Sequence, residues 1–197
     1  MPGSGQRKIG NRICQRLSEV RGTQASSMAE FAIALPLLVV LIVGIFDFGA
    51  AFNLKQELNN AMREGARFGA SQPSNDLCLG CSIAPPSVDA VRSLVSSYLL
   101  AAKINDCGLS SATGLGGGSL LWIYTANGCS APLKLQVERG DAVQETVDGT
   151  QIQVIYTHVK ITYPYQWHFN SVIQLLVPGA NYGLSSILTE ATAVNMD

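Results

Sequence analysis

The chain has 197 residues, of which 47% are hydrophobic and 14% charged, and its formal net charge is −1. This length suits one domain of ordinary size with an appendage. The charged fraction is low against about a quarter in typical soluble domains, and the nearly neutral total excludes a chain that is basic or acidic throughout.

The first residues form a basic leader. Residues 1–22 hold five bases and one acid, a net charge of +4, and the rest of the chain carries −5. A basic arm can bind nucleic acid, but one that directly precedes an apolar run is more typical of the cytoplasmic flank of a membrane segment. We therefore expect the chain to contact a lipid bilayer and no nucleic acid.

An uncharged run follows the leader. It spans the sixteen residues from Phe31 to Phe46, which as a helix would cover about 24 Å of the roughly 30 Å hydrocarbon core. Asp47 would then lie near the outer interface, where an ionised group costs less than at the bilayer centre. A cleaved secretory signal is the alternative, but the length of the run and the helical pattern beyond it favour a resident span. Pro36 lies inside the run, where membrane helices tolerate proline.

The helical pattern continues past the apolar run. One face, rich in small residues that permit close approach of another element, recurs at three- and four-residue steps; it comprises Leu54, Leu58, Ala61, Met62, Gly65, Phe68 and Gly69. Glu64 and Arg67 lie off this face at the spacing of a helical ion pair, and Pro73 ends the pattern. We predict one helix over 26–72 that starts in the membrane and ends as the spine of a domain over 73–197.

Four cysteines follow the apolar run: Cys78, Cys81, Cys107 and Cys129. An even set on the outer side of a membrane favours disulfides, with three possible connectivities. A zinc site and a thioredoxin-like redox motif are the competing interpretations of the C-x-x-C spacing. A second close cysteine pair is lacking, and the surrounding sequence "NDLCLGCSIAPP" has the composition of a loop. Disulfides are therefore the favoured interpretation, and we expect no metal and no cofactor.

The remaining sequence predicts an α+β domain. Ser87 is the expected N-cap of a second helix, and strand-like runs follow at 120–125, 133–138, 152–163 and 186–194. Arg139-Gly140-Asp141 and Asp148-Gly149 are expected hairpin turns, which implies antiparallel pairing. The alternation of the third run slips between Val154 and Ile155, where a bulge could reset its faces.

Catalytic motifs are scarce in this domain. His158 and His168 are the only histidines, no G-x-S-x-G or comparable motif exists, and we expect no enzymatic activity. The sequence "YPYQW" at 163–167 could form an adhesive patch or a subunit contact, but packing at the end of a strand is the favoured interpretation.

The segment "MAEFAIALPLLVVLIVGIFDFGAAFNLKQELNNAMREGARFGA" resembles the amino-terminal signature of TadE-like proteins, the minor pilins or pseudopilins of tight-adherence pilus systems. The resemblance covers about 45 of the 197 residues. It is carried by Glu30, Phe31, Leu35, Pro36, Gly44, Asp47, Asn60, Ala61, Arg63, Glu64, Gly65, Ala66 and Arg67.

The resemblance implies a protein held in the bacterial inner membrane, with a cytoplasmic amino terminus and an extracytoplasmic pilin-like domain, that can reach the cell surface in a pilus. Its implied partners are a prepilin peptidase, other pilin or pseudopilin subunits and the pilus assembly platform. Family precursors carry Gly before the cleavage site and Glu as the fifth mature residue. Counting back from Glu30 places cleavage between Ala25 and Ser26, so Ala25 stands where the family has Gly; cleavage after Gly22 is the alternative.

Glu30 has a role in this interpretation. An ionised carboxylate in lipid is costly unless it is paired, and in pilins its partner is the amino terminus of a neighbouring subunit. The alternative is that the Glu30 carboxylate simply faces the cytoplasmic headgroups. The alternative for the whole protein is a single-pass extracytoplasmic binding or sensor module with an uncleaved anchor.

Overall fold

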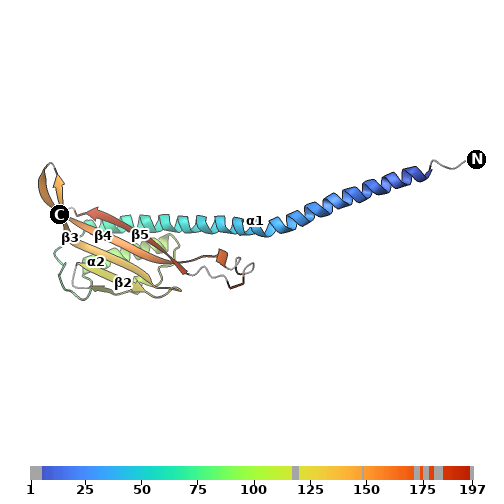
Figure 1. Ribbon diagram of the computed structural model, residues 1–197. Coiled ribbons are helices and arrows are strands. Elements are labelled where there is room, and N and C mark those ends of the chain that lie inside the picture. The colour runs from blue at the N-terminus through green and yellow to red at the C-terminus, as the bar shows by residue number, and fades with distance from the viewer. Residues whose placement is uncertain are drawn as a thin grey trace, which may run out of the picture.

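The computed structural model describes residues 6–116, 120–147, 149–170, 174, 178–179 and 184–195. The side chains of 6–25, and with them that of Ala25, fall outside this description. The described part of the chain is an α+β protein in which a long helix projects from an antiparallel sheet (Figure 1). Its elements are α1 (Gln6–Ala70), α2 (Pro86–Ala101), the short 3-10 helix η1 (Leu109–Ser111), β1 (Gly114–Gly116), β2 (Leu121–Ala126), β3 (Leu133–Val147), β4 (Thr150–Gln166) and β5 (Leu184–Val194).

Helix α1 is longer than the predicted helix because it continues back through the leader to Gln6. It ends at Ala70, where the N–H groups of Ser71 and Gln72 donate to carbonyls of the last turn. Pro73 lacks an N–H and could not continue the helix. Pro36 lies inside α1, and the bend seen in Figure 1 is of the kind that an interior proline produces.

The sheet has the order β1-β2-β3-β4-β5, and every neighbouring pair is antiparallel. The four predicted strands are present, and β3 and β4 extend beyond their predicted ends. Strand β1, in the glycine-rich stretch, was not predicted, because two of its three residues are glycines.

The expected turn at Arg139-Gly140-Asp141 is wrong, because β3 continues through it as a β-bulge. Arg139 pairs with Thr157 and Asp141 pairs with Tyr156, so Gly140 has no residue opposite it and takes a φ of +84°. A left-handed residue of this kind favours glycine. The bulge that was expected in β4 is wrong, because Val154 and Ile155 pair in regular register with Val143 and Ala142. At the second expected turn Gly149 has a φ of +79°, and Asp148 lies outside the described residues.

Ser87 is not the N-cap of α2, because Pro85 holds that position. Ser87 lies in the first turn and is buried, where its N–H and hydroxyl each donate to the carboxylate of Asp76 at 2.8 Å. The guanidinium of Arg139 also donates to the Ser87 hydroxyl. The serine thus ties the helix to the preceding loop and to β3 instead of capping it.

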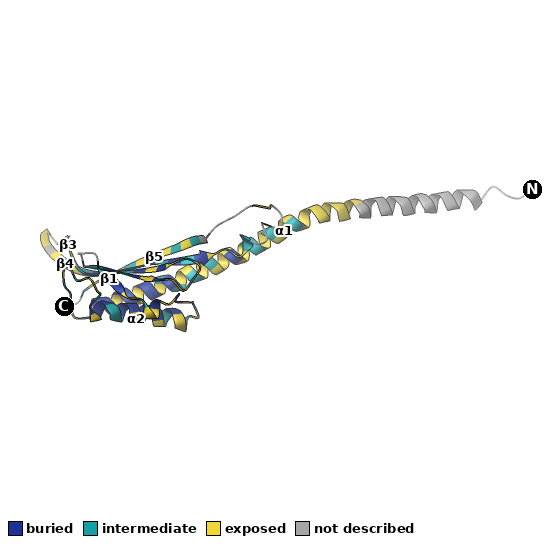
Figure 2. Cartoon of the chain, turned by 90° about the horizontal axis from the view of Figure 1, so that it is seen from below, coloured by how far each residue is buried: buried dark blue, intermediate teal, exposed yellow. Residues whose placement is uncertain are grey.

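The distal half of α1 packs against both α2 and the sheet (Figures 1 and 2). Glycines permit this close approach: a Cβ added at Gly65 would lie 2.9 Å from Val95 Cγ2, and one at Gly69 would lie 2.7 Å from Thr157 Cγ2. The small-residue face of the predicted helix is therefore buried inside the domain. The fully buried members of the core include Leu58, Met62 and Ala66 of α1, Val91, Val95 and Leu99 of α2, and Trp122, Tyr124, Leu135, Val137, Val159 and Ile161 of the sheet.

Candidate functional site

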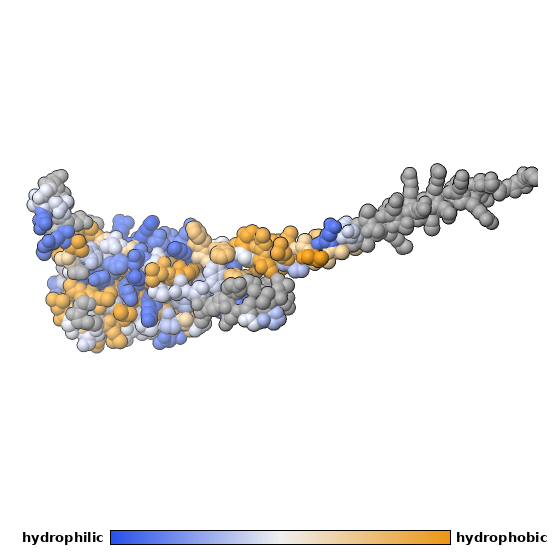
Figure 3. Space-filling model, viewed as in Figure 1, coloured by the Kyte–Doolittle hydropathy of each residue, from blue (hydrophilic) through white to orange (hydrophobic). Residues whose placement is uncertain are grey.

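The part of α1 that precedes the domain exposes its apolar side chains. Phe31 is 64% exposed, Leu37 74% and Phe46 75%, and Figure 3 shows hydrophobic surface along the helix where it leaves the domain. Within the described residues α1 is the one helix long and apolar enough to cross a membrane, with a mean hydropathy of 2.7 in its best window. The structure therefore offers a single candidate membrane span.

Glu30 lies at the leader end of this apolar run and is exposed. Its Oε1 lies 3.4 Å from the hydroxyl of Ser26, one helical turn earlier. The carboxylate makes no ion pair with any side chain that the structure describes. Its charge is thus left to solvent, lipid headgroups or another molecule.

Asp47 lies at the other end of the run and has the opposite environment. It is only 4% exposed, and its carboxylate accepts hydrogen bonds from the Tyr165 hydroxyl and the Phe169 N–H, both at 2.9 Å. His168 Nδ1 lies 3.2 Å from the same carboxylate. A buried carboxylate needs such donors to offset its desolvation. The apolar run is therefore bracketed by one acid, Asp47, whose carboxylate is hydrogen-bonded within the chain, and one acid, Glu30, whose carboxylate has the Ser26 hydroxyl as its neighbour among the described side chains.

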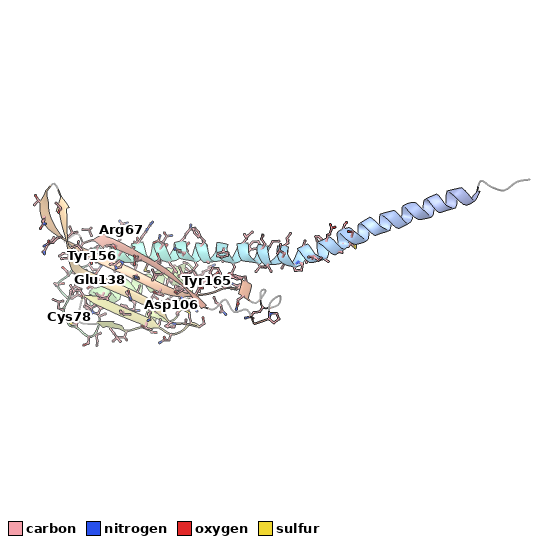
Figure 4. All side chains as sticks on the ribbon, viewed as in Figure 1. Arg67, Cys78, Asp106, Glu138, Tyr156 and Tyr165 are labelled. Atoms are coloured by element: carbon pink, nitrogen blue, oxygen red, sulfur yellow. A yellow bond between two sulfur atoms is a disulfide. The ribbon has the colours of Figure 1, made fainter. Side chains whose placement is uncertain are left out.

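The donors to Asp47 come from the end of β4 and the residues just after it, which Figure 4 places beside α1 at the label of Tyr165. Burial, the hydrogen bond to Asp47 and its negative charge together raise the pKa of Tyr165 to about 12. The tyrosine therefore stays protonated and keeps donating at neutral pH.

Four rings, here called the aromatic cluster, surround this contact: Phe48, Tyr165, Trp167 and Phe169. The Trp167 ring lies 5.1 Å from Phe48, 5.0 Å from Tyr165 and 5.4 Å from Phe169, in edge-to-face arrangements. Its Nε1–H donates to the Ser185 hydroxyl at 2.7 Å. Tyr163 and Tyr165 are 8% and 7% exposed, so the expected packing at a strand end is confirmed for these two residues.

The residues of the family motif between Asn60 and Arg67 lie on two faces of α1. Ala61, Gly65 and Ala66 are buried against the domain, whereas Asn60, Arg63, Glu64 and Arg67 are exposed. The expected ion pair of Glu64 with Arg67 does not form within the part of the chain that the structure describes. Gly44 lies earlier in the helix, within the apolar run, and a Cβ added there would have no atom within 4 Å. The exposed residues of the motif and Gly44 are thus open to other molecules.

The four cysteines of the domain lie in two disulfides, one joining Cys78 to Cys81 and the other Cys107 to Cys129. Their Cα atoms are 5.6 Å and 5.0 Å apart, respectively. Among the described residues no group of His, Cys, Asp and Glu side chains is arranged to hold a metal ion.

The two histidines occupy different environments. His158 lies on the sheet, 3.7 Å from Glu138 and 3.6 Å from Glu190, where it forms part of a surface charge cluster with Lys160. His168, whose side chain is 82% exposed, approaches Asp47. Neither lies beside a nucleophilic side chain in the interactions that the structure describes.

The sequence did not identify the partners of Asp47. Two signals for them exist: an acid directly after an apolar run must find donors if it is buried, and the segment "YQWHF" at 165–169 offers aromatic rings with polar groups at their tips. Only the fold brings them together, because Tyr165 lies 118 residues from Asp47.

In comparison with known proteins, residues 25–67 match the family model described as TadE-like protein. The match covers the end of the leader, the apolar run and the buried spine of α1. No curated protein and no solved structure shows significant similarity to the chain.

Proposed function

We propose that the chain, whose amino-terminal helix matches the TadE-like family model over residues 25–67, is a minor pilin or pseudopilin, a non-catalytic structural component of a tight-adherence pilus or its assembly complex. It is held in the inner membrane by α1 before assembly. Its partners are a prepilin peptidase, other pilin-like subunits and the assembly platform.

The contrast between Glu30 and Asp47 carries this proposal. An acid near lipid that served only the fold would be expected to have donors within its own chain, as Asp47 has. Among the side chains that the structure describes, the polar neighbour of Glu30 is the Ser26 hydroxyl at 3.4 Å. An exposed carboxylate at the start of a lipid-facing helix suits a positive partner from another subunit, because such a pair is strong where water is excluded.

The amino terminus created by cleavage supplies that partner. Cleavage between Ala25 and Ser26 makes Glu30 the fifth residue of the mature chain, the register that the family resemblance implies. Cleavage after Gly22 would instead make Glu30 the eighth mature residue, so the register of Glu30 favours the cut between Ala25 and Ser26. In the mature protein the new amino group belongs to Ser26, and the Glu30 of a neighbouring subunit is its counter-charge.

Orientation follows from the charge of the leader. The net charge of +4 over residues 1–22 retains that end in the cytoplasm, because positive flanks are not readily translocated. The domain with its two disulfides then lies on the extracytoplasmic side, where such bonds persist. Assembly into a pilus would carry it to the cell surface.

Mass spectrometry of the membrane-extracted protein tests the proposal. Expressed with an active prepilin peptidase, the protein should have a mature amino terminus at Ser26, and an Ala25→Glu variant should remain uncut. A leader that stays intact beside the active peptidase would refute the proposed processing. That result would favour the second candidate, a single-pass extracytoplasmic binding or sensor module with an uncleaved anchor. The observation behind this candidate is Ala25, which stands where the family has glycine before the cleavage site.

A further inference from the structure

We propose that the aromatic cluster of Phe48, Tyr165, Trp167 and Phe169 is a membrane-interface anchor that seats the globular domain on the bilayer where α1 leaves it. This inference rests on the proposed membrane span of α1, and it adds a second contact with lipid made by the carboxyl end of β4.

The cluster lies at the level along α1 where the bilayer should end. The eighteen residues from Glu30 to Asp47 span about 25 Å of helix, close to the roughly 30 Å of a hydrocarbon core. Phe48 directly follows Asp47, and Trp167 and Phe169 pack against Phe48 at 5.1 and 6.4 Å between ring centroids. The residues that follow β4 therefore place aromatic rings beside α1 at the expected membrane interface.

The chemistry of the cluster suits that interface. Tryptophan and tyrosine are enriched where lipid meets water, because their rings are apolar and their tips are polar. The Nε1–H of Trp167 donates a hydrogen bond to the Ser185 hydroxyl, and the hydroxyl of Tyr165 donates one to the Asp47 carboxylate. Tyr165 itself is buried, so it supports the cluster from within, whereas Phe48, Trp167 and Phe169 keep part of their rings exposed and can enter the acyl boundary without an unpaired donor.

Continuity of the exposed surface identifies lipid, not a second protein, as the occupant. Side chains at three- and four-residue steps form one exposed apolar stripe that runs unbroken past Asp47: Leu41 is 58% exposed, Ile45 63%, Phe48 63% and Phe52 65%. Asp47 turns inward and is 4% exposed, so its charge does not interrupt the stripe. The first basic residue after it is Lys55.

Tryptophan fluorescence tests this anchor in the full-length protein. The chain has two tryptophans, and Trp122 is fully buried in the core, so the emission that a Trp167→Phe variant lacks belongs to Trp167. Both proteins are reconstituted into vesicles of phosphatidylcholine and phosphatidylglycerol whose acyl chains carry bromine either near the headgroup or near the methyl end. Flotation of the vesicles reports membrane insertion separately.

We expect the Trp167 emission to be quenched by the shallow bromines more than by the deep ones, and the emission of the Trp167→Phe variant to be little affected. Flotation without any quenching of Trp167 would overturn the anchor and leave the membrane span intact, whereas failure to float would overturn the span itself. Stronger quenching by the deep bromines would also overturn the interfacial position. Quenching that disappears when the protein-to-lipid ratio is raised would show that a second copy covers the cluster, and it would overturn lipid as the occupant.

Discussion

The hydroxyl of Tyr165 donates to the carboxylate of Asp47 at 2.9 Å and so fastens the end of β4 to α1 at the first charged residue after the uncharged run. Both residues are nearly excluded from solvent, at 7% and 4% exposure. A hydrogen bond to a buried charged group contributes more to stability than one between neutral groups. This contact ties the end of β4 to α1, in addition to the packing of α1 in the domain core.

A Tyr165→Phe variant tests the contact. It should lower the free energy of unfolding by about 1–3 kcal/mol, because a buried charge loses a donor. Amide hydrogen exchange at Phe169, whose N–H donates to the same carboxylate, should become faster. Tyr163→Phe is the matched control, since it removes a hydroxyl that donates to the carbonyl of Asn105 at 2.9 Å. Equal exchange at Phe169 in the two variants would contradict the proposed fastening.

Close packing of α1 on the domain is tested at Gly69. A Gly69→Ala variant should be destabilised by about 1–3 kcal/mol through overpacking, because its Cβ would lie 2.7 Å from Thr157 and 3.1 Å from Val91. At Gly49 nothing lies within 4 Å of a Cβ, and Gly49→Ala should instead stabilise the helix by up to about 1 kcal/mol. Thermal unfolding of the detergent-solubilised proteins measures both changes. A Gly69→Ala protein as stable as the wild type would show that the helix can shift away from the sheet.

Acid stability depends on Asp106, which is 7% exposed. Burial pushes its pKa upward, but hydrogen bonds from the N–H groups of Ser110 and Gly108 and from the Ser96 hydroxyl hold the pKa below its ordinary value of 3.8. A carboxyl whose pKa is lower in the folded state stabilises the fold above its unfolded pKa, and that stability is lost as the pH falls through the folded pKa.

The unfolding free energy of the wild-type protein should therefore drop more steeply than that of an Asp106→Asn variant as the pH falls below about 4. Denaturant unfolding followed at a series of acidic pH values measures the two slopes. Parallel slopes would mean that the carboxyl of Asp106 does not contribute to acid unfolding.

Assembly is expected to depend on the charge of Glu30. A Glu30→Gln variant keeps the size of the side chain, so insertion into the membrane should be unchanged, whereas each subunit contact should weaken by about 2–5 kcal/mol because a buried charge pair loses one partner. Quantitative blotting of membrane and sheared-pilus fractions measures insertion and incorporation. Glu57→Gln, at an acid on the same helix that lies outside the family motif, is the control and should assemble normally. Wild-type incorporation of Glu30→Gln would refute the charge pair.

The two disulfides should contribute unequally to stability. Cys107 and Cys129 are 22 residues apart, and Cys78 and Cys81 are 3 apart. Constraint of the unfolded chain predicts losses of about 3 and about 2 kcal/mol when each pair is replaced by serine. Cys107 is also buried in the core, which should add to the first loss. Chemical unfolding of the two double-serine variants measures the difference, and an equal or reversed order would contradict it.

The sequence alone determined the features that depend on local periodicity. Apolar side chains and small residues at helical steps predicted the apolar span and the buried face of α1, and β-branched runs predicted four of the five strands that the structure describes. The family match over residues 25–67 lies wholly within that helix. These signals are local because the side chains that form one face of a helix or strand recur at a fixed spacing within that element.

Tertiary structure decided what joins residues far apart in the chain. The disulfide pairing, the bulge at Gly140 and the contact of Ser87 with Asp76 all depend on which elements become neighbours. So do the donors to Asp47, which lie 118 to 122 residues away. The apolar run alone left Asp47 as an acid at a membrane boundary; the folded sheet buries that acid and supplies its hydrogen bonds, because a charge leaves water at tolerable cost only where donors are already in place.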